Sequence, residues 1–309
     1  MSLEVMRKVK FYIDKYSITC NSMILSGAGT RPTAAKRKPE DETMTTRSKT
    51  EEATAKAPCC ESTADPCCGT SATQDSYGDS LEAVDTARST PKGRRRQRDS
   101  LRDQGYADED LAGVPESVLA TTFGSGNPLA IAEIPRGSVV VDIGSGTGLD
   151  VFLSARRTGP EGKVYGIDPS PKMRARADEN RARLGVGNVE FLEGSAEKIP
   201  LPDGAADLVL SNCVLSCCAT GETAFHEAFR VLKPGGRFAS TDVVPAETGT
   251  PPPAGILDGA GYRRRLEEAG FADVRIEKGN LEIGLGGATE DPSGVIRAST
   301  ILVRARRPR

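Results

Sequence analysis

Eight cysteines give this sequence its largest concentration of reactive side chains, and six of them stand in three adjacent pairs. They are Cys20, Cys59, Cys60, Cys67, Cys68, Cys213, Cys217 and Cys218. An ionised cysteine is both a nucleophile and a ligand for soft, thiophilic elements. Residues 1–27 lack the unbroken apolar run of a secretory leader, so we expect the thiols in a reducing cytoplasm. Clustered cysteines there indicate redox, catalytic or metal-binding roles rather than disulfides.

A glycine-rich loop is the second feature that could bind a ligand. It reads Asp142-Ile143-Gly144-Ser145-Gly146-Thr147-Gly148 and joins an apolar run at 138–143 to a helical pattern at 149–157. Glycines at such a loop let the backbone turn sharply and approach a ligand without a clash at Cβ. Nicotinamide-dependent dehydrogenases and non-catalytic dinucleotide-binding domains use a related loop, so this pattern alone does not identify the ligand.

Further residues after the next strands narrow the choice. Asp168 ends the second predicted strand, where a carboxylate can accept hydrogen bonds from a ribose diol. This order of motifs resembles the class I S-adenosylmethionine-dependent methyltransferases. The resemblance implies S-adenosylmethionine as cofactor, held by Asp142, Gly144, Ser145, Gly146, Thr147, Gly148, Asp168, Pro169, Met173, Ser195, Ala196 and Asn212.

Alternating apolar runs and amphipathic stretches predict the elements that position these residues. We expect strands at 138–143, 163–168, 189–192, 207–211, 237–240, 274–276 and 300–303, and helices at 149–157, 171–184, 220–232 and 261–269. Residues 233–236, which include two glycines, should end the third helix. Alternation of this kind predicts an α/β fold with a doubly wound, parallel, Rossmann-like sheet.

Composition divides the chain into three parts. Residues 1–104 are predicted to be a mostly disordered extension, because 30–98 carries few large apolar side chains, and order should begin near Asp108. Residues 105–245 are the predicted cofactor-binding domain. Residues 246–309 are predicted to form a small α+β portion on the substrate side, with the closing strands.

The bulk numbers exclude some partners. Net charge is −2, aromatic residues make up 5% of the chain and tryptophan is absent, which argues against nucleic acid. The basic run Arg94-Arg95-Arg96 is interpreted as a solvated linker. No stretch is long and apolar enough to span a bilayer. We therefore expect a cytoplasmic monomer that acts on a small molecule.

Several segments from about residue 105 to 304 resemble the bacterial arsenite methyltransferases. They are 123–130 (Phe-Gly-Ser-Gly-Asn-Pro-Leu-Ala), 151–157, 159–162, 211–216 (Ser-Asn-Cys-Val-Leu-Ser) and 229–236. The pairs Cys59-Cys60 and Cys67-Cys68 also resemble the cysteine pairs that precede the catalytic domain in that family. The segment at 211–216 is the part of the resemblance that points to arsenic.

The resemblance implies that trivalent arsenic is held by thiolates, that its lone pair attacks the sulfonium methyl group, and that a thiol reductant is a co-substrate. Cys213 matches one cysteine of the family. Ser125 stands where the family has a second, and Pro252 aligns with the third. Cys217 and Cys218, together with Cys59, Cys60, Cys67 or Cys68, are candidates to rebuild a soft site.

Three alternatives stay open. The chain could methylate an unrelated organic acceptor, such as a quinone-like molecule, if its substrate has changed. It could also bind a metalloid without turnover. Zinc is a weaker reading of the cysteine pairs, which lack the two-residue gap of structural zinc sites. The single histidine, His226, is interpreted as a surface or packing residue of a helix.

Overall fold

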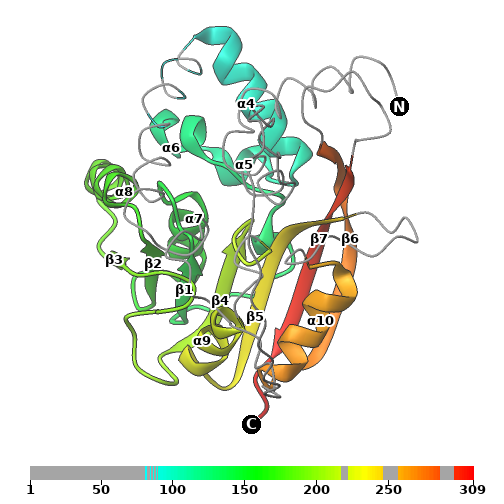
Figure 1. The fold of residues 1–309 in the computed structure, drawn as a ribbon. Coiled ribbons are helices and arrows are strands. Elements are labelled where there is room, and N and C mark those ends of the chain that lie inside the picture. The colour runs from blue at the N-terminus through cyan, green and yellow to red at the C-terminus, as the bar shows by residue number, and fades with distance from the viewer. Residues whose placement is uncertain are drawn as a thin grey trace, which may run out of the picture.

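A computed structural model describes residues 81, 84, 86, 88, 90–216, 222–245, 257–285 and 296–309, with the backbone alone at 282–285 and 296–297. Its helices are α4 (Pro91–Asp103), α5 (Asp108–Leu111), α6 (Glu116–Thr121), α7 (Leu149–Thr158), α8 (Pro171–Leu184), α9 (Thr223–Val231) and α10 (Gly259–Glu268), with a short 3-10 helix η1 (Pro128–Ala130). Its strands are β1 (Val139–Ile143), β2 (Lys163–Asp168), β3 (Val189–Glu193), β4 (Ala206–Asn212), β5 (Leu232–Pro245), β6 (Ala272–Leu285) and β7 (Ile296–Arg306). Figure 1 shows these helices arranged around one central sheet.

The sheet has seven strands in the order β3-β2-β1-β4-β5-β7-β6. Strands β1 to β5 pair in parallel, and β7 pairs antiparallel with both β5 and β6. Strand order reverses between β1 and β4, the point where open α/β sheets bind their ligands. The predicted α/β class with a doubly wound sheet is confirmed. The closing strands β6 and β7, expected in the C-terminal portion, join the same sheet and run antiparallel to each other.

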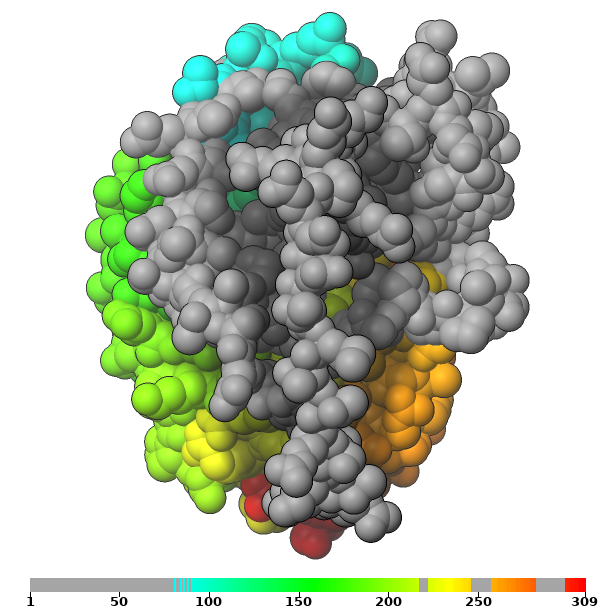
Figure 2. Space-filling model, in the orientation of Figure 1, coloured from blue at the N-terminus to red at the C-terminus, as the bar shows by residue number. Residues whose placement is uncertain are grey.

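Both faces of the sheet are covered, because consecutive residues of a buried strand point to opposite sides. Val140 packs with Leu101, Val118 and Phe152, so α4, α6 and α7 lie over one face. Val141 packs instead with residues of α9 and α10, which lie over the other face. In the space-filling view α4 lies at one end of the molecule and the C-terminal residues at the other (Figure 2).

Order begins earlier in the chain than Asp108, so that expectation is wrong. Helix α4 starts at Pro91, where the Thr90 side chain accepts a hydrogen bond from the Gly93 backbone N–H at 3.0 Å. Leu101 on this helix is fully buried. The polar sequence of α4 resembled a linker, and the arginine run at 94–96 lies on this helix rather than in a linker. Residues before 81 lie outside the described part of the chain.

The predicted helices at 149–157, 171–184 and 261–269 are confirmed within two residues, whereas β5 is longer than expected. Residues 233–236 end helix α9 as predicted but already belong to β5. Leu232 pairs with Ala206 and Arg237 with Leu208, so residues 233–236 interrupt the pairing of β5 with β4, and Gly235 there has a φ of 79°. The glycines therefore produce a local irregularity within the strand.

A buried carboxylate fastens β5 to α10 and to the turn after β4. Asp242 is fully buried and accepts hydrogen bonds from the Tyr262 hydroxyl at 2.8 Å and from the Ser216 hydroxyl at 2.8 Å. Ser240 Oγ also lies 2.9 Å from the Tyr262 hydroxyl. Burial raises the pKa of Asp242 to about 6, and the hydrogen bonds from Ser216 and Tyr262 oppose that rise. The network therefore connects three elements at the carboxyl edge of the sheet.

Replacing Tyr262 by Phe should destabilise the fold by about 1–3 kcal/mol, because the buried Asp242 carboxylate loses a donor. The pKa of Asp242 should rise further, since the lost hydrogen bond favoured the ionised form. A carboxyl whose pKa is raised by folding lowers the free energy of unfolding as pH rises through that pKa. The difference in free energy of unfolding between wild type and Tyr262→Phe should therefore be present above about pH 6 and shrink below it. Urea unfolding at several pH values measures this. Tyr165→Phe, on β2 outside this network, is the control, and an equal loss in both variants would contradict the assignment.

Candidate active site

The glycine loop connects β1 to α7 at the point where strand order reverses. Gly144, Gly146 and Gly148 all have positive φ, at 72°, 52° and 101°. Such angles are strained for any side chain with a Cβ. A Cβ at Gly148 would lie 2.8 Å from the Phe152 ring, whereas the space beside Gly146 is open. The loop is therefore tightly packed at Gly148 and leaves space for a ligand beside Gly146.

Asp168 fixes the glycine loop against the end of β2. Its carboxylate accepts hydrogen bonds from the backbone N–H groups of Gly146 and Ser170, at 2.8 and 2.9 Å. A carboxylate has about four lone-pair positions, so it retains capacity for a ribose diol. Asp168 ends β2, which pairs with β1, and the glycine loop follows β1. This arrangement fits the sugar of an adenosine-containing cofactor.

Three buried carboxylates surround the loop, and they distinguish between possible cofactors. Burial raises the pKa of Asp142 well above its usual range, and the charges of Asp150 and Asp168 raise it further. Burial also raises the pKa of Asp150 to about 6. Asp150 is the second residue of α7, at the helix end where a dinucleotide pyrophosphate would bind. Negative charge there disfavours a pyrophosphate and favours a cation such as a sulfonium or an ammonium group.

The remaining predicted cofactor residues lie along the same edge, after β2, β3 and β4. Pro169 is half-buried, and Met173 is buried in α8, whose N-cap Ser170 accepts from the Met173 backbone N–H at 3.3 Å. Ser195 pairs with Lys198 in an isolated bridge after β3, next to the buried Ala196. Within the loop, Ser145 and Thr147 are buried. The structure brings all these residues to one edge, and their contact with a cofactor stays a prediction.

Cys213 lies in a turn immediately after β4. Its φ is 61°, an unfavourable backbone conformation for a residue with a Cβ, and its backbone N–H donates to the Thr241 carbonyl at 2.8 Å. The next residue, Val214, packs on the glycine loop so closely that a Cβ at Gly144 would lie 2.3 Å from it. The half-buried Cys213 therefore stands beside the predicted cofactor loop.

The segment around Ser125 lies against the same turn. The Ser125 backbone N–H donates to the side-chain oxygen of Asn212 at 2.9 Å, one residue before Cys213. A Cβ at Gly124 would clash with the Asn212 amide, and one at Gly126 would crowd Thr241. Ser125 is 2% exposed, and its hydroxyl has no hydrogen-bond partner among the described residues. Positions 125 and 213, two of the three thiol positions that the arsenite methyltransferase resemblance identifies, thus belong to neighbouring segments.

Cys213 is the one cysteine within the described part of the chain. Cys217, Cys218, Cys59, Cys60, Cys67, Cys68 and Pro252 lie outside it. Residues 213–216 form a turn that follows β4. Within the described ranges, no three His, Cys, Asp or Glu side chains are placed to hold a metal ion. His226 is exposed on α9, its Nδ1 3.0 Å from the Glu222 carbonyl.

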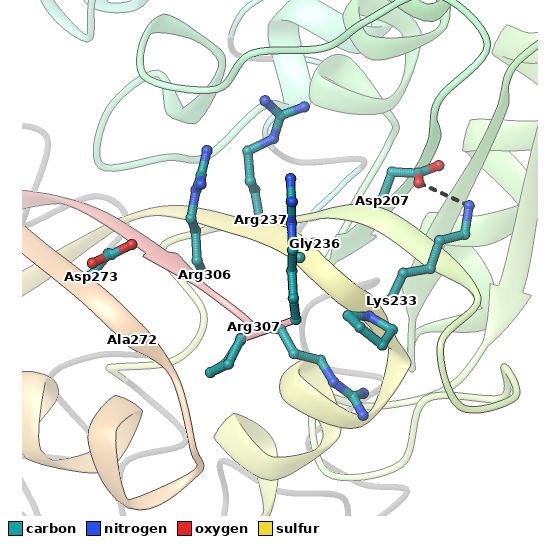
Figure 3. A pocket seen from close by; sticks show the side chains of 12 residues that line it. Asp207, Lys233, Gly236, Arg237, Ala272, Asp273, Arg306 and Arg307 are labelled. Atoms are coloured by element: carbon teal, nitrogen blue, oxygen red, sulfur yellow. Dashed lines mark hydrogen bonds and ion pairs between the residues drawn. The ribbon is translucent and has the colours of Figure 1, made fainter.

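A basic pocket of about 510 Å³ lies at the opposite edge of the sheet, where β4, β5 and β6 begin and β7 ends (Figure 3). Most of its cations already have partners. Lys233 pairs with Asp207 at 2.8 Å, Arg237 pairs with Glu133 at 2.7 Å, and Arg307 donates to three backbone carbonyls. Because ligands of such sheets bind outside the carboxyl ends of the strands, we place the active site at the glycine loop.

Two residues at the glycine-loop edge of the sheet were not predicted from the sequence. Asp150 carries the only local signal, since it follows the glycine loop in the first helical turn. Tyr106 lies far upstream, and its hydroxyl donates to Asp150 at 2.7 Å. No pattern in the sequence links these two residues.

Among the described helices, none combines the length and apolar character needed to cross a membrane.

Affinity for S-adenosylmethionine should fall as pH drops from about 8 to about 5.5, because protonated carboxyls no longer attract its positive charges. Since binding a cation favours the ionised forms of Asp142 and Asp150, binding near pH 6 should release protons. Calorimetry in two buffers of different ionisation enthalpy measures both effects. Asp142→Asn should weaken binding at pH 8 and flatten the pH dependence. A wild-type affinity that does not change with pH would contradict the electrostatic argument.

The comparisons with known proteins agree with this geometry. Residues 134–252 match the family described as a methyltransferase domain. An arsenite methyltransferase of Halobacterium salinarum is 38% identical over 183 residues, which is 56% of this chain and 46% of that protein. A ubiquinone/menaquinone biosynthesis C-methyltransferase of Salmonella arizonae is 37% identical over 106 residues, or 34% of this chain and 42% of that protein. The aligned part thus covers less than half of either relative.

A solved structure extends the likeness to three dimensions. It is an arsenic(III) S-adenosylmethionine methyltransferase from Chlamydomonas reinhardtii, with 27% identity and a TM-score of 0.52, covering 65% of this chain and 73% of that one. Residues 134–252 therefore carry a methyltransferase domain, and the chain is similar to arsenite methyltransferases over about half of their length.

Proposed function

We propose that this protein transfers a methyl group from S-adenosylmethionine to trivalent arsenic, held as arsenite or a methylated arsenical by cysteine thiolates. The observation that carries the proposal is the position of Cys213. Its strained turn contacts the glycine loop through Val214 and the Ser125 segment through Asn212. Backbone strain of this kind persists where the surrounding structure enforces it, which is common at functional sites.

The chemistry suits a thiolate at this place. Trivalent arsenic is soft and exchanges a hydroxyl for a thiol, so that As(OH)₃ and the Cys213 thiol give an As–S bond and water. The bound cofactor supplies an electrophilic methyl group. Arsenic has a lone pair and needs no general base, so the protein's task is to hold the two reactants together. The absence of a histidine from this part of the described structure is consistent with that requirement.

The remaining arsenic ligands are part of the same proposal. A serine hydroxyl is hard and un-ionised at neutral pH, so Ser125 cannot replace a thiolate. We assign the missing ligands to Cys217 or Cys218 and to a thiol of the pairs Cys59-Cys60 and Cys67-Cys68. A thiol reductant is the proposed co-substrate, and the proposed setting is a cytoplasmic monomer. A site that keeps few thiolates would favour a methylated arsenical, which has fewer positions to fill.

An organic acceptor is the second candidate. The 37% identity over 106 residues to a ubiquinone/menaquinone biosynthesis C-methyltransferase favours it. Loss of two of the three expected cysteines, to Ser125 and Pro252, also fits a changed substrate. Methylation of a quinone-like molecule would require neither Cys213 nor an added reductant, and this difference separates the two candidates.

Cys213→Ser should abolish arsenic methylation while leaving cofactor binding intact. The full chain is incubated with labelled S-adenosylmethionine, a thiol reductant and either arsenite or methylarsonous acid, and the arsenic species are then separated. The variant should lose at least about 100-fold in rate, because removing a direct ligand costs more than removing a group that orients one. Methylation that survives in Cys213→Ser would contradict the ligand role. No product from the wild type, with the cofactor bound, would direct the search to organic acceptors.

Ser125→Cys should tighten arsenite binding by about tenfold or more, ~1.4 kcal/mol, because it adds a soft ligand beside Cys213. The Ser125 hydroxyl has no partner among the described residues, so the exchange breaks no hydrogen bond found there. Ser154→Cys is a matched control, since that hydroxyl is equally buried and unpartnered but lies on α7. Titration with arsenite measures both. Equal affinities in the two variants would show that position 125 does not reach the arsenical.

A further inference from the structure

Asn212 ends β4 one residue before Cys213, and the nitrogen of its side-chain amide lies among three acceptors from separate segments. It is 2.9 Å from the Gly126 carbonyl, 3.1 Å from the Asp150 carboxylate and 3.1 Å from the Tyr106 hydroxyl. Gly126 belongs to the segment that carries Ser125, whereas Asp150 belongs to the helix that starts at the glycine loop. This amide therefore links the segment that carries Ser125 to the helix that follows the glycine loop.

The oxygen of the same amide is also fully used. It accepts hydrogen bonds from the Ser125 backbone N–H at 2.9 Å and from the Thr241 hydroxyl at 2.9 Å. Thr241 in turn accepts the Cys213 backbone N–H on its carbonyl at 2.8 Å. The position of Asn212 thus determines the positions of two neighbours, Ser125 through a hydrogen bond and Cys213 through the chain.

Asp150 anchors this amide from the side of the cofactor loop. Its two carboxylate oxygens accept from different partners, Tyr106 at 2.7 Å on one and Asn212 at 3.1 Å on the other. Asp150 is 6% exposed and Tyr106 is 2% exposed. Hydrogen bonds to a buried charged group are among the strong ones in proteins, so the three side chains form a rigid connection.

We propose that Asn212 and Asp150 are positioning residues, which hold the Cys213 turn and the Ser125 segment in register with the glycine loop. The inference rests on the proposed function, because register matters where a methyl group and its acceptor must meet. Displacing reacting groups by about 1 Å lowers a rate by about 100-fold. Neither residue contacts arsenic in this role. They act through the backbone of Cys213 and through the first turn of α7.

Only an amide at 212 can complete this network. An aspartate there would have the same shape but would offer no donor to Gly126, and it would place a second buried charge beside Asp150. Exchanging the two residues restores an amide–carboxylate pair, with the amide now on α7 as donor and the carboxylate at the end of β4 as acceptor. The exchange still loses the bond to Gly126. Both the single variant Asn212→Asp and the double exchange Asp150→Asn/Asn212→Asp carry a charge at position 212, but only the double exchange keeps a hydrogen bond between residues 150 and 212. Comparing the two therefore separates the effect of losing this hydrogen bond from the effect of the charge.

The test compares wild type, Asn212→Asp, the double exchange and Asn188→Asp. Asn188 also donates to two backbone carbonyls, at 2.8 and 3.3 Å, but it precedes β3 and lies outside the network. Each protein is measured for S-adenosylmethionine affinity, for the kcat of arsenic methylation and for amide hydrogen exchange in peptides covering 122–127 and 212–216. Tyr106→Phe, which removes one hydroxyl, is the milder variant should Asn212→Asp fail to fold.

We expect Asn212→Asp to lose about 100-fold in kcat at saturating cofactor and to lose exchange protection in both peptides. The double exchange should recover at least about tenfold of the lost kcat. Tyr106→Phe should change kcat and protection in the same direction by a smaller factor. A variant at 212 that behaves like Asn188→Asp would overturn the proposal, as would a double exchange no better than Asn212→Asp.

The hydrogen-exchange measurements need no arsenic, and they keep this inference separate from the proposed function. If the wild type produces no methylated arsenical, the proposed function fails, and exchange protection at 122–127 and 212–216 still decides whether the network positions the turn. Equal protection in all four proteins would then overturn the inference. If the wild type methylates arsenic and Asn212→Asp does so at the same rate, the function stands and the inference falls.

Discussion

Parallel pairing of β1 with β4 brings the loop after β1 next to the turn after β4, and the proposed chemistry depends on that contact. The two segments are about seventy residues apart in the chain, yet Val214 packs directly on Gly144. Strand order reverses at this point, so α7 and α9 leave for opposite faces and do not cover the edge between them. A loop that binds a cofactor and a turn that carries a thiol meet there as a consequence of topology.

Electrostatics then restricts what the loop can bind. Asp142, Asp150 and Asp168 are buried together, and the charges of Asp150 and Asp168 add to the effect of burial in raising the pKa of Asp142. A ligand with positive charge relieves this repulsion, and one with phosphates increases it. The same glycine spacing serves dinucleotides and S-adenosylmethionine in different proteins. The acid at the start of α7 is therefore the physical feature that separates the two cases in this fold.

The acceptor side is built from segments that share little sequence proximity. Residues 122–127, the end of β4 and Thr241 on β5 are connected by one side-chain amide, and Asp242 holds the turn after Cys213 through Ser216. This side has a structure that suits a small acceptor close to the cofactor loop. Among the described residues it has one thiol, Cys213, next to the buried hydroxyl of Ser125.

Several features could be predicted from the sequence alone, because they depend on local patterns. Apolar runs predicted four strands, β1 to β4, close to their observed bounds, and the helix expected at 171–184 has these bounds in the structure. Glycine spacing predicted a loop with positive φ, and Asp168 predicted a carboxylate at the end of the second strand. The resemblance to methyltransferases rested on these local motifs, and the fold and the family comparisons confirm it.

Tertiary structure decided the rest, since it depends on residues far apart in the chain. Helix α4 has a polar sequence that predicts a linker, and burial of Leu101 and Gln97 stabilises it as a helix. Strands β6 and β7 gave no sign of their antiparallel direction. The side-chain amide of Asn212, a predicted cofactor residue, also forms hydrogen bonds with five protein groups. Those partners come from four separate segments, and no local pattern specifies which buried donor will meet which acceptor once the sheet has formed.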